Sequence, residues 1–135
     1  METFNKKDLN MKENRWLRLA VKEAEKSTYH QKVGAVVFNK NEFISCGHNY
    51  PNRSIQNHHP KFRKYPQTVH AEVDAIINAR KDLKGASIIV VRINNQGQLR
   101  LSKPCKYCMM YIKHVQLKKI YYTISAYPYI EMIKV

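Results

Sequence analysis

Four residues of this 135-residue chain combine the types and the spacing of a metal site with a proton carrier beside it. His70 and Glu72 lie two positions apart in the stretch TVHAEVDAI, and Cys105 and Cys108 lie three positions apart in SKPCKYC. Zinc prefers nitrogen and sulfur ligands in tetrahedral geometry, and a catalytic zinc keeps one position for water. One histidine and two cysteines would fill three positions, and the Glu72 carboxyl could carry the proton of an activated water. The spacing therefore predicts a zinc site with hydrolytic chemistry.

Each of these residues also has an ordinary structural interpretation. The cysteine pair could be half of a structural zinc site or a redox pair, although the sequence has no second pair to complete four sulfur ligands. His70 could be a capping histidine, and Glu72 could be a first-turn acid that a helix dipole favours. The third cysteine, Cys46, lies in the apolar stretch EFISCGHN and is predicted to be a small buried side chain.

The predicted elements describe one three-layer α/β/α domain spanning residues 1–135. Apolar residues at helical spacing predict helices, and β-branched or aromatic runs between turn residues predict strands. Because only three residues separate the last two strands, we expect those strands to be antiparallel. Gly34 indicates that a ligand or another backbone approaches its strand closely. We expect a five-stranded mixed sheet with helices on both faces. The predicted helices are residues 8–26, 70–83 and 105–117, and the predicted strands are 32–38, 42–48, 86–93, 118–125 and 129–135, with a turn leading into a short stretch at 98–102.

The segment 50–69 breaks this pattern and is predicted to be a long basic loop near the active site. Long loops in compact domains tend to carry function. It could be a lid, an oligomer contact, or a phosphate grip that uses Arg53, Lys61, Arg63 and Lys64. Its paired histidines, His58 and His59, are predicted to be solvated loop residues rather than ligands of a second metal.

The composition favours partners that carry phosphate. The chain has 24 Lys and Arg residues against 10 acidic residues, a net charge of +14. Such a charge attracts phosphate-bearing molecules, including single-stranded nucleic acid, although an A/T-biased genome would also enrich lysine. No apolar run approaches the ~18 residues that a membrane span requires, and the N-terminal stretch has no apolar segment of the signal-peptide kind. We therefore expect a cytoplasmic protein without a membrane partner.

The pattern H-x-E followed by P-C-x-x-C matches the signature of the zinc-dependent nucleobase deaminases. HAEVDAI and KPCKYC resemble the cytidine and deoxycytidylate deaminase superfamily, and VGAVVF with ISCGHN resembles its first hairpin. The likeness covers roughly residues 12–125 and implies a cytidine-deaminase-like fold. It also implies that His70, Cys105 and Cys108 bind Zn²⁺ and that Glu72 is the catalytic proton carrier.

The same resemblance implies where a substrate would bind. The Ala71 N–H would contact the base carbonyl, carbonyls near Ser102 and Lys103 would receive the leaving ammonia, and Asn49 would touch the sugar. Asn49 could equally be the turn residue that ends a strand. The full set of expected substrate contacts is Asn49, Ala71, Val33, Ser102, Lys103 and Pro104.

Three functional hypotheses follow. The first is hydrolytic deamination of a cytosine nucleotide or nucleoside, with deoxycytidylate preferred. The second is deamination of cytosine or adenine in single-stranded DNA or tRNA. The third is a non-catalytic zinc-stabilised nucleic-acid-binding module, which Glu72 argues against because a structural site needs no base. For the second, several aromatic residues could stack on flanking bases, although several could also pack in the core; these are Phe62, Tyr65, Tyr107, Tyr111, Tyr121 and Tyr122.

Two features of the sequence point to different branches of the superfamily. An antiparallel last strand resembles the free-nucleoside cytidine deaminases, whereas the motif that begins with histidine resembles the deoxycytidylate, tRNA and polynucleotide branches. By analogy with such relatives we expect a homo-oligomer. Exposed aromatics in the stretch YPYIEMIKV could contribute to the contact between subunits.

Overall fold

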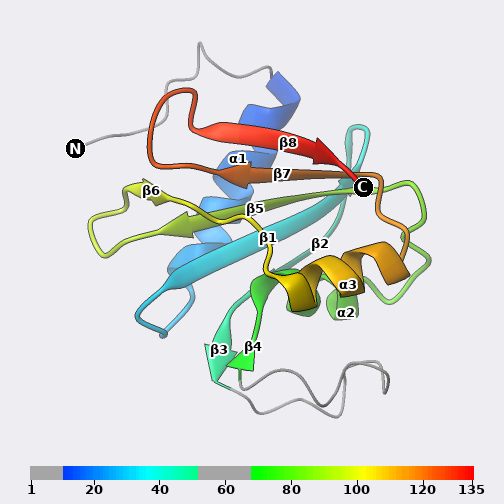
Figure 1. Cartoon of the computed structure of the whole chain (residues 1–135), viewed down its shortest axis with the longest axis horizontal. Coiled ribbons are helices and arrows are strands. Elements are labelled where there is room, and N and C mark those ends of the chain that lie inside the picture. The colour runs from blue at the N-terminus through cyan, green and yellow to red at the C-terminus, as the bar shows by residue number, and fades with distance from the viewer. Residues whose placement is uncertain (1–10, 52–67) are drawn as a thin grey trace.

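The computed structural model describes residues 11–51 and 68–135 and has a central mixed sheet between two layers of helices (Figure 1). The sheet has the strand order β2-β1-β5-β7-β8, with the short β6 paired to β5. Its elements in chain order are α1 (Met11–Glu25), β1 (Lys32–Asn39), β2 (Glu42–His48), β3 (Tyr50–Pro51), β4 (Thr68–Val69), α2 (Ala71–Ala79), β5 (Ser87–Ile93), β6 (Leu99–Arg100), α3 (Lys106–His114), β7 (Lys119–Thr123) and β8 (Ile130–Lys134).

The connections of the strands follow from the lengths of chain between them. Two residues join β1 to β2, and these strands are antiparallel. The one parallel pair among the described strands, β5 with β7, is joined through α3, because a parallel pair requires a long crossover. The short turn after β7 brings β8 back antiparallel to it. The predicted mixed sheet with an antiparallel last pair is therefore confirmed.

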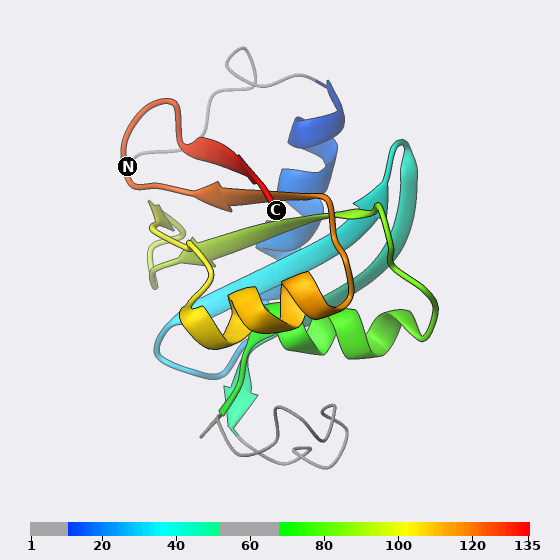
Figure 2. The same cartoon turned by 45° about the vertical axis from the view of Figure 1, so that its right-hand side comes forward.

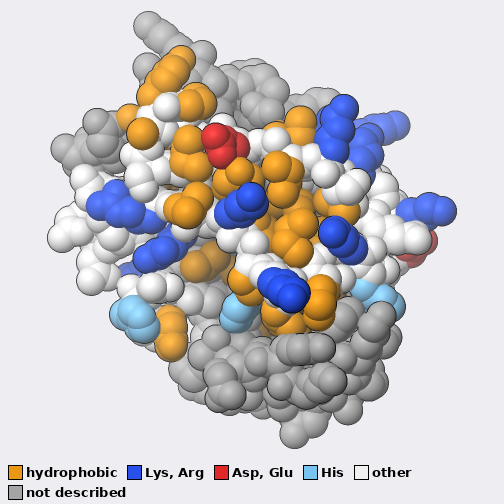
Figure 3. All heavy atoms as spheres, in the orientation of Figure 1, with side chains coloured by type: hydrophobic (Ala, Val, Ile, Leu, Met, Phe, Trp, Pro, Cys, Tyr) orange, Lys and Arg blue, Asp and Glu red, His pale blue; other side chains and the backbone are white. Residues whose placement is uncertain are grey.

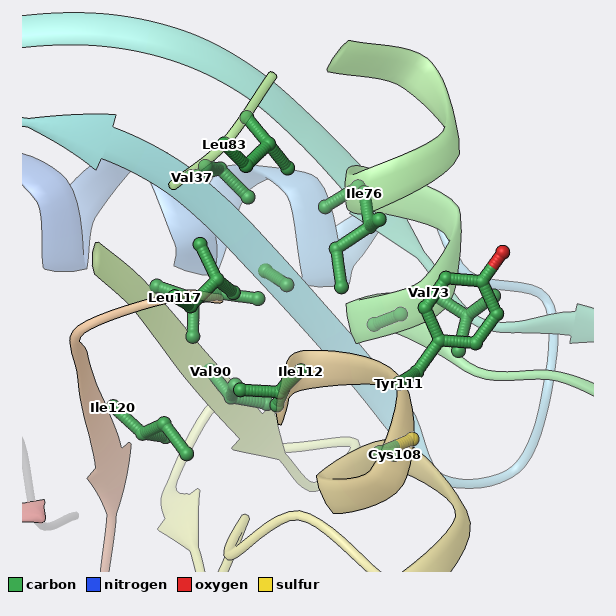
Figure 4. Close-up of a cluster of buried hydrophobic side chains, with 14 of the residues drawn as sticks. Val37, Val73, Ile76, Leu83, Val90, Cys108, Tyr111, Ile112, Leu117 and Ile120 are labelled. Carbon is green, nitrogen blue, oxygen red and sulfur yellow. The ribbon is translucent and has the colours of Figure 1, made fainter. Parts of the chain in front are cut away.

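Helices cover both faces of the sheet, as the sequence predicted (Figures 1 and 2). Alternate residues of β1 and β5 face opposite sides, so each strand supplies two cores. Val36 and Ile89 pack with Trp16 and Leu17 of α1. On the other face, residues of β1 and β5 pack with α2 and α3 in a second cluster (Figure 4) that includes Val37, Val73, Ile76, Val90, Cys108, Tyr111 and Ile112.

Two glycines on neighbouring strands let one helix on each face approach the sheet closely. A Cβ atom at Gly34 would overlap the backbone of α1 at Ala20 and Ala24, and one at Gly47 would overlap the backbone of α2 at Ala75. The predicted close approach at Gly34 is therefore that of another backbone. Gly47 lies opposite Ala35 in the register with β1, next to Gly34.

Replacing Gly34 by alanine is expected to destabilise the fold, because the added methyl group meets backbone atoms that cannot rotate away. Overpacking of this kind costs about 1–3 kcal/mol. The loss would be measured as a lower urea midpoint with an unchanged slope of the free energy of unfolding. A variant as stable as the parent protein would show that α1 lies farther from β1 than the structure places it.

The helices end earlier than their apolar periodicity predicted. The second helix was expected to reach residue 83 but ends at Ala79, where Arg80 adopts a left-handed conformation with φ 52°. Leu83 is nevertheless buried, because the loop after α2 returns it to the core. Leu117 behaves in the same way beyond α3. Apolar residues at helical spacing therefore marked the core correctly but extended both helices too far.

The segment 50–69 is not all loop. Its ends form a two-stranded antiparallel pair in which Tyr50 lies opposite Val69 and Pro51 opposite Thr68. This pair delivers the chain directly to His70. The basic residues and the histidine pair predicted within the segment lie outside the described residues: Arg53, His58, His59, Lys61, Arg63 and Lys64. In the parts of the chain that the structure describes, no helix has the length and apolarity needed to cross a membrane.

Candidate zinc centre and active site

Two helix N-termini bring the predicted metal ligands together. His70 is the N-cap residue of α2 and Cys105 is the N-cap residue of α3, both with extended backbone and without a side-chain capping bond. Cys108 lies one turn further into α3, so it shares a helix face with Cys105. The two helices contact each other on the same face of the sheet. Their positive dipole ends favour thiolate over thiol at this position.

The three ligand atoms have the spacing of a tetrahedral zinc site. His70 Nδ1 lies 3.2 Å from Cys108 Sγ and 3.5 Å from Cys105 Sγ, and all three atoms lie within 4.8 Å of one another. With Zn–N of about 2.1 Å and Zn–S of about 2.3 Å, ligand atoms of a tetrahedron lie about 3.6–3.8 Å apart. The donor set and its dimensions therefore fit zinc.

The electrostatics of the cysteine pair favour one thiolate. A hydrogen bond from the Cys108 thiol lowers the pKa of Cys105 to about 4, which outweighs burial, and His70 lowers it further. The same bond, together with burial, raises the pKa of Cys108 well above its ordinary value. The hydrogen bond to Cys105 raises the pKa of His70 against the effect of burial. Thiolate is the form of cysteine that binds metals.

Glu72 lies beside these ligands in the first turn of α2 and is only 6% exposed. Burial raises the pKa of its carboxyl, while its own backbone N–H and His70 act in the opposite direction. A carboxyl with a raised pKa can both accept and return a proton nearer to neutral pH than an exposed glutamate can. The side chain is therefore suited to proton transfer within the pocket.

A pocket of about 210 Å³ opens beside this cluster. Five of the predicted substrate contacts line it, whereas Pro104 is buried outside the lining. Four other lining residues belong to no motif and were not predicted. They come from the loop before β1, from β5 and from the loop before α3: Tyr29, Gln31, Arg92 and Leu101. The predicted lining residues are Val33, Asn49, Ala71, Ser102 and Lys103.

Asn49 uses its side-chain amide to hold the chain that enters β1. Its Oδ1 accepts a hydrogen bond from the Val33 N–H at 2.9 Å, and its Nδ2 donates to the Gln31 carbonyl at 2.6 Å. Asn49 therefore links the end of the first hairpin to the segment that enters β1. Since it also lines the pocket, the sugar contact stays a prediction.

A second buried network fixes the loop before α3. The Ser102 hydroxyl donates to the Val90 carbonyl at 2.7 Å, and the same oxygen accepts from the Thr123 N–H at 2.7 Å. The Thr123 hydroxyl donates to the Arg100 carbonyl at 2.7 Å and accepts from the Arg92 N–H at 3.3 Å. These bonds attach the pocket wall at residues 100–102 to β5 and β7.

Replacing Thr123 by valine is expected to lower stability and to loosen this wall, because the isosteric side chain leaves buried polar partners unsatisfied. Each such loss costs about 1–3 kcal/mol. Urea unfolding would measure the stability, and a raised KM for the substrate would indicate that the pocket wall at residues 100–102 is less well ordered. Ser125→Ala, which removes an exposed hydroxyl two residues away, is the matched control and should stay within about 0.5 kcal/mol. Equal stability of both variants would contradict the network.

Asp74 attaches the first turn of α2 to the end of β2 and to β3. Its carboxylate accepts hydrogen bonds from the His48 N–H and the Tyr50 hydroxyl, each at 3.1 Å. Burial raises the pKa of Asp74, while these donors act against that rise. Because Tyr50 belongs to β3 and Asp74 follows Glu72 by two residues, the pair braces the chain on both sides of His70.

The prediction for Cys46 was wrong in part. The side chain is half-buried rather than enclosed, and its thiol donates a hydrogen bond to the Glu23 carboxylate at 3.3 Å. Burial and Glu23 together raise the pKa of Cys46 to about 11, so the thiol stays protonated. Glu23 also bonds to His48 at 2.8 Å and to Lys26 at 3.0 Å. The polar partner was invisible in the apolar stretch around Cys46.

Three of the four described aromatic side chains that were considered as stacking platforms belong to the core. Tyr111 and Tyr122 are buried, and Tyr121 packs on Phe38. The half-buried Tyr107 places its ring edge-on to His70, with 5.8 Å between ring centroids. It therefore supports the metal ligand from the side of α3. The two remaining aromatics, Phe62 and Tyr65, lie outside the described residues.

The surface over α3, β7 and β8 is mixed in character. Figure 3 shows lysine and arginine side chains spread between hydrophobic ones on this face, with few acidic side chains. Beyond it, Tyr127 in the turn between β7 and β8 is 67% exposed. No single basic track emerges among the described residues of this face, so the net charge by itself does not define a nucleic-acid groove.

The cluster of one histidine, two cysteines and one buried glutamate is the arrangement expected of a zinc-binding site with a proton carrier beside it. The chain belongs to the family described as the cytidine and deoxycytidylate deaminase zinc-binding region, whose model matches residues 10–124. This match confirms the resemblance that the sequence motifs indicated. It also accounts for the zinc-type ligand set of His70, Cys105 and Cys108.

Particular relatives agree with that family. A protein of Aliivibrio fischeri described as an uncharacterized deaminase in the luxG 3′ region is 33% identical over 93 residues, which cover 67% of this chain and 56% of that relative. The chain thus spans little more than half the length of that curated relative.

Solved structures share the fold. The dCMP deaminase of cyanophage S-TIM5 in apo form has a TM-score of 0.61 and 21% identity, covering 82% of this chain and 81% of that chain. The same phage enzyme was also solved in complex with dCMP and dUMP. Cytidine deaminase from Burkholderia pseudomallei has a TM-score of 0.61 and 16% identity, covering 92% of this chain and 93% of that chain.

Proposed function

We propose that this protein is a zinc-dependent hydrolytic deaminase that converts a cytosine nucleotide or nucleoside into the uracil form and releases ammonia. The observation that carries the proposal is the buried Glu72 carboxyl beside His70 and Cys105 in one pocket. A structural zinc site has no use for such a group. Membership of a deaminase family and a fold shared with dCMP and cytidine deaminases support the same reaction.

In this proposal each residue has a separate task. His70, Cys105 and Cys108 would hold zinc, which when bound would act as a Lewis acid and make water more acidic. Glu72 takes one proton of the attacking water and delivers it to the departing amine, and the second proton of the water ends on ring nitrogen N3. The water oxygen forms a bond to C4 of the ring, the bond from C4 to the amino nitrogen breaks, and ammonia leaves.

The pocket walls would orient the base and the sugar. The Ala71 backbone lies at the start of α2 within the lining, where its N–H would contact the base carbonyl. The buried network around Ser102 would keep the carbonyls near Lys103 in place for the leaving ammonia. We include in the proposal that the chain forms one domain, works in the cytoplasm and assembles as a homo-oligomer.

Ammonia release by the zinc-loaded protein tests this proposal. Cytidine, deoxycytidine, CMP and dCMP would be supplied in parallel, together with a cytosine-containing single strand of DNA. Turnover of any of the four small molecules supports the proposed function. If all four are inert with zinc bound at one ion per chain, the proposal is wrong.

Deamination within a strand is the second candidate, and the net charge of +14 favours it. The rim residue Leu101 is 55% exposed and, with the half-buried Tyr29, offers apolar surface to a neighbouring base. Strand binding through phosphates would weaken steeply as salt is raised. Turnover of the strand alone, with that salt dependence, would establish this candidate in place of the first.

A further inference from the structure

Arg92 is a half-buried cation inside the active-site pocket. It lies on β5, opposite Val33 of β1 and opposite Arg100 of β6 in the register of the sheet. Its backbone N–H bonds to the Thr123 hydroxyl, so the strand position is fixed by the buried network. Arg92 lines the pocket together with Val33 and Lys103, and strand alternation places its side chain on the same face of β5 as Ile88 and Val90, the face that α2 and α3 cover. The metal ligands come from α2 and α3, whereas this wall belongs to the sheet.

The guanidinium of Arg92 has no acidic partner among the residues that the structure describes. The ion pairs in that part of the chain are those of Glu23 with Lys26 and with His48. Among the described residues, Glu72 is the one acidic residue in the pocket lining, and the side chains of Glu72 and Arg92 form no ion pair. Partial burial of an uncompensated charge costs free energy, which a ligand of opposite charge would recover.

Arg100 of β6, which lies opposite Arg92, has hydrogen-bond partners within its own part of the chain. Its guanidinium donates to the Leu99 carbonyl at 3.0 Å and to the Gln98 side chain at 3.2 Å, and it does not line the pocket. The two arginines lie directly opposite each other on paired strands, but their guanidinium groups differ in their hydrogen-bond partners. One is engaged by its own strand and turn, and the other is left facing the pocket.

We infer that Arg92, with Lys103, forms a phosphate subsite, so that the substrate is a cytosine nucleoside monophosphate. This inference rests on the proposed function and narrows its substrate class. The phosphate is the one anionic group of such a molecule, and arginine binds it through two parallel hydrogen bonds. A phosphate monoester carries a charge of about −1.5 to −2 at pH 7, which two cations match. Lys103 is exposed and adds charge at the rim.

The test compares dUMP with deoxyuridine by isothermal titration, since these products bind without turnover. The parent protein is expected to bind dUMP about 10- to 100-fold more tightly, the size of one charge-assisted pair. Arg92→Gln should lose at least about 10-fold more affinity for dUMP than for deoxyuridine, and Arg92→Lys should recover part of that difference. Arg100→Gln removes the same charge outside the lining and should keep the parental ratio.

Two further arms protect the result against misfolding and against a different phosphate source. Lys103→Gln changes an exposed residue and should lower dUMP affinity selectively even if Arg92→Gln is poorly folded. A cytosine-containing single strand is titrated beside dUMP. Arg92-dependent binding of the strand without binding of dUMP would overturn the inference in favour of a polynucleotide.

The remaining outcomes separate the inference from the proposed function. Equal affinity of the parent protein for dUMP and deoxyuridine, or equal losses in Arg92→Gln and Arg100→Gln, would overturn the phosphate subsite. Deamination of deoxycytidine and dCMP with the same kcat/KM would refute the subsite and leave the deaminase intact. Arg92-dependent dUMP binding without any deamination would keep the subsite and refute the reaction.

Discussion

Replacing Glu72 by glutamine is expected to lower kcat for deamination by about 10²–10⁴-fold, the usual contribution of a positioned acid–base group. Glutamine keeps the size of the side chain but can neither accept nor return a proton at neutral pH. The zinc content should stay at one ion per chain, because Glu72 is not a member of the ligand cluster. Initial rates with dCMP and metal analysis of the same preparation would measure both quantities.

The stability of this variant gives an independent check. Because burial raises the pKa of Glu72, the folded state disfavours its charged form. A neutral amide removes that cost, so Glu72→Gln should be at least as stable to urea as the parent protein. Glu42→Gln, at an exposed acid on the edge strand β2, is the control and should keep both rate and stability. A Glu72→Gln protein with parental kcat would mean that the catalytic carboxyl lies elsewhere.

Replacing Cys105 by alanine is expected to reduce zinc affinity by more than about 100-fold, since even partners that only orient a ligand contribute 10–100-fold. Deamination should fall with the zinc content. The fold should persist, because Cys105 is exposed at the start of α3. Zinc per chain after dialysis, urea unfolding and the rate of ammonia release would be measured on the same sample.

Two other cysteine variants serve for comparison, one at the second cysteine ligand and one at a cysteine outside the cluster. Cys108→Ala should lose zinc in the same way and should also lose stability without metal, because Cys108 is fully buried beside Tyr111 and Ile112 (Figure 4). Cys46→Ala, at the half-buried third cysteine, should keep parental zinc content. Full zinc occupancy in Cys105→Ala would remove this residue from the ligand set.

The zinc cluster was predictable because its geometry is local. Two short motifs each place their residues at the start of a helix, and helix geometry then fixes their relative positions. The motifs by themselves do not predict that the two helix N-termini lie side by side, because His70 and Cys105 are 35 residues apart in the sequence. That arrangement depends on the sheet, whose β-branched and aromatic runs were equally visible in the sequence.

The opposite wall of the pocket was not predictable by the same means. Arg92 looked like one more basic residue in a chain with 24 Lys and Arg residues. Its position in the pocket follows from the register of β5 with β1 and β6, which no short stretch of sequence specifies. Tyr29 and Gln31 lie in a loop without a motif. A polar residue within the apolar strand SIIVVRI was the one signal that could have singled out Arg92.

The pairing of β3 with β4 has an evolutionary consequence. Neighbouring strands lie about 4.8 Å apart, so the pair holds Pro51 and Thr68 together whatever length of chain connects them. Doubling the length of a flexible connection costs only about 0.6 kcal/mol. Segments of different length and charge could therefore be grafted between these two residues while His70 keeps its position. The sequence between Pro51 and Thr68 could therefore change in evolution while the metal ligands His70, Cys105 and Cys108 stay together.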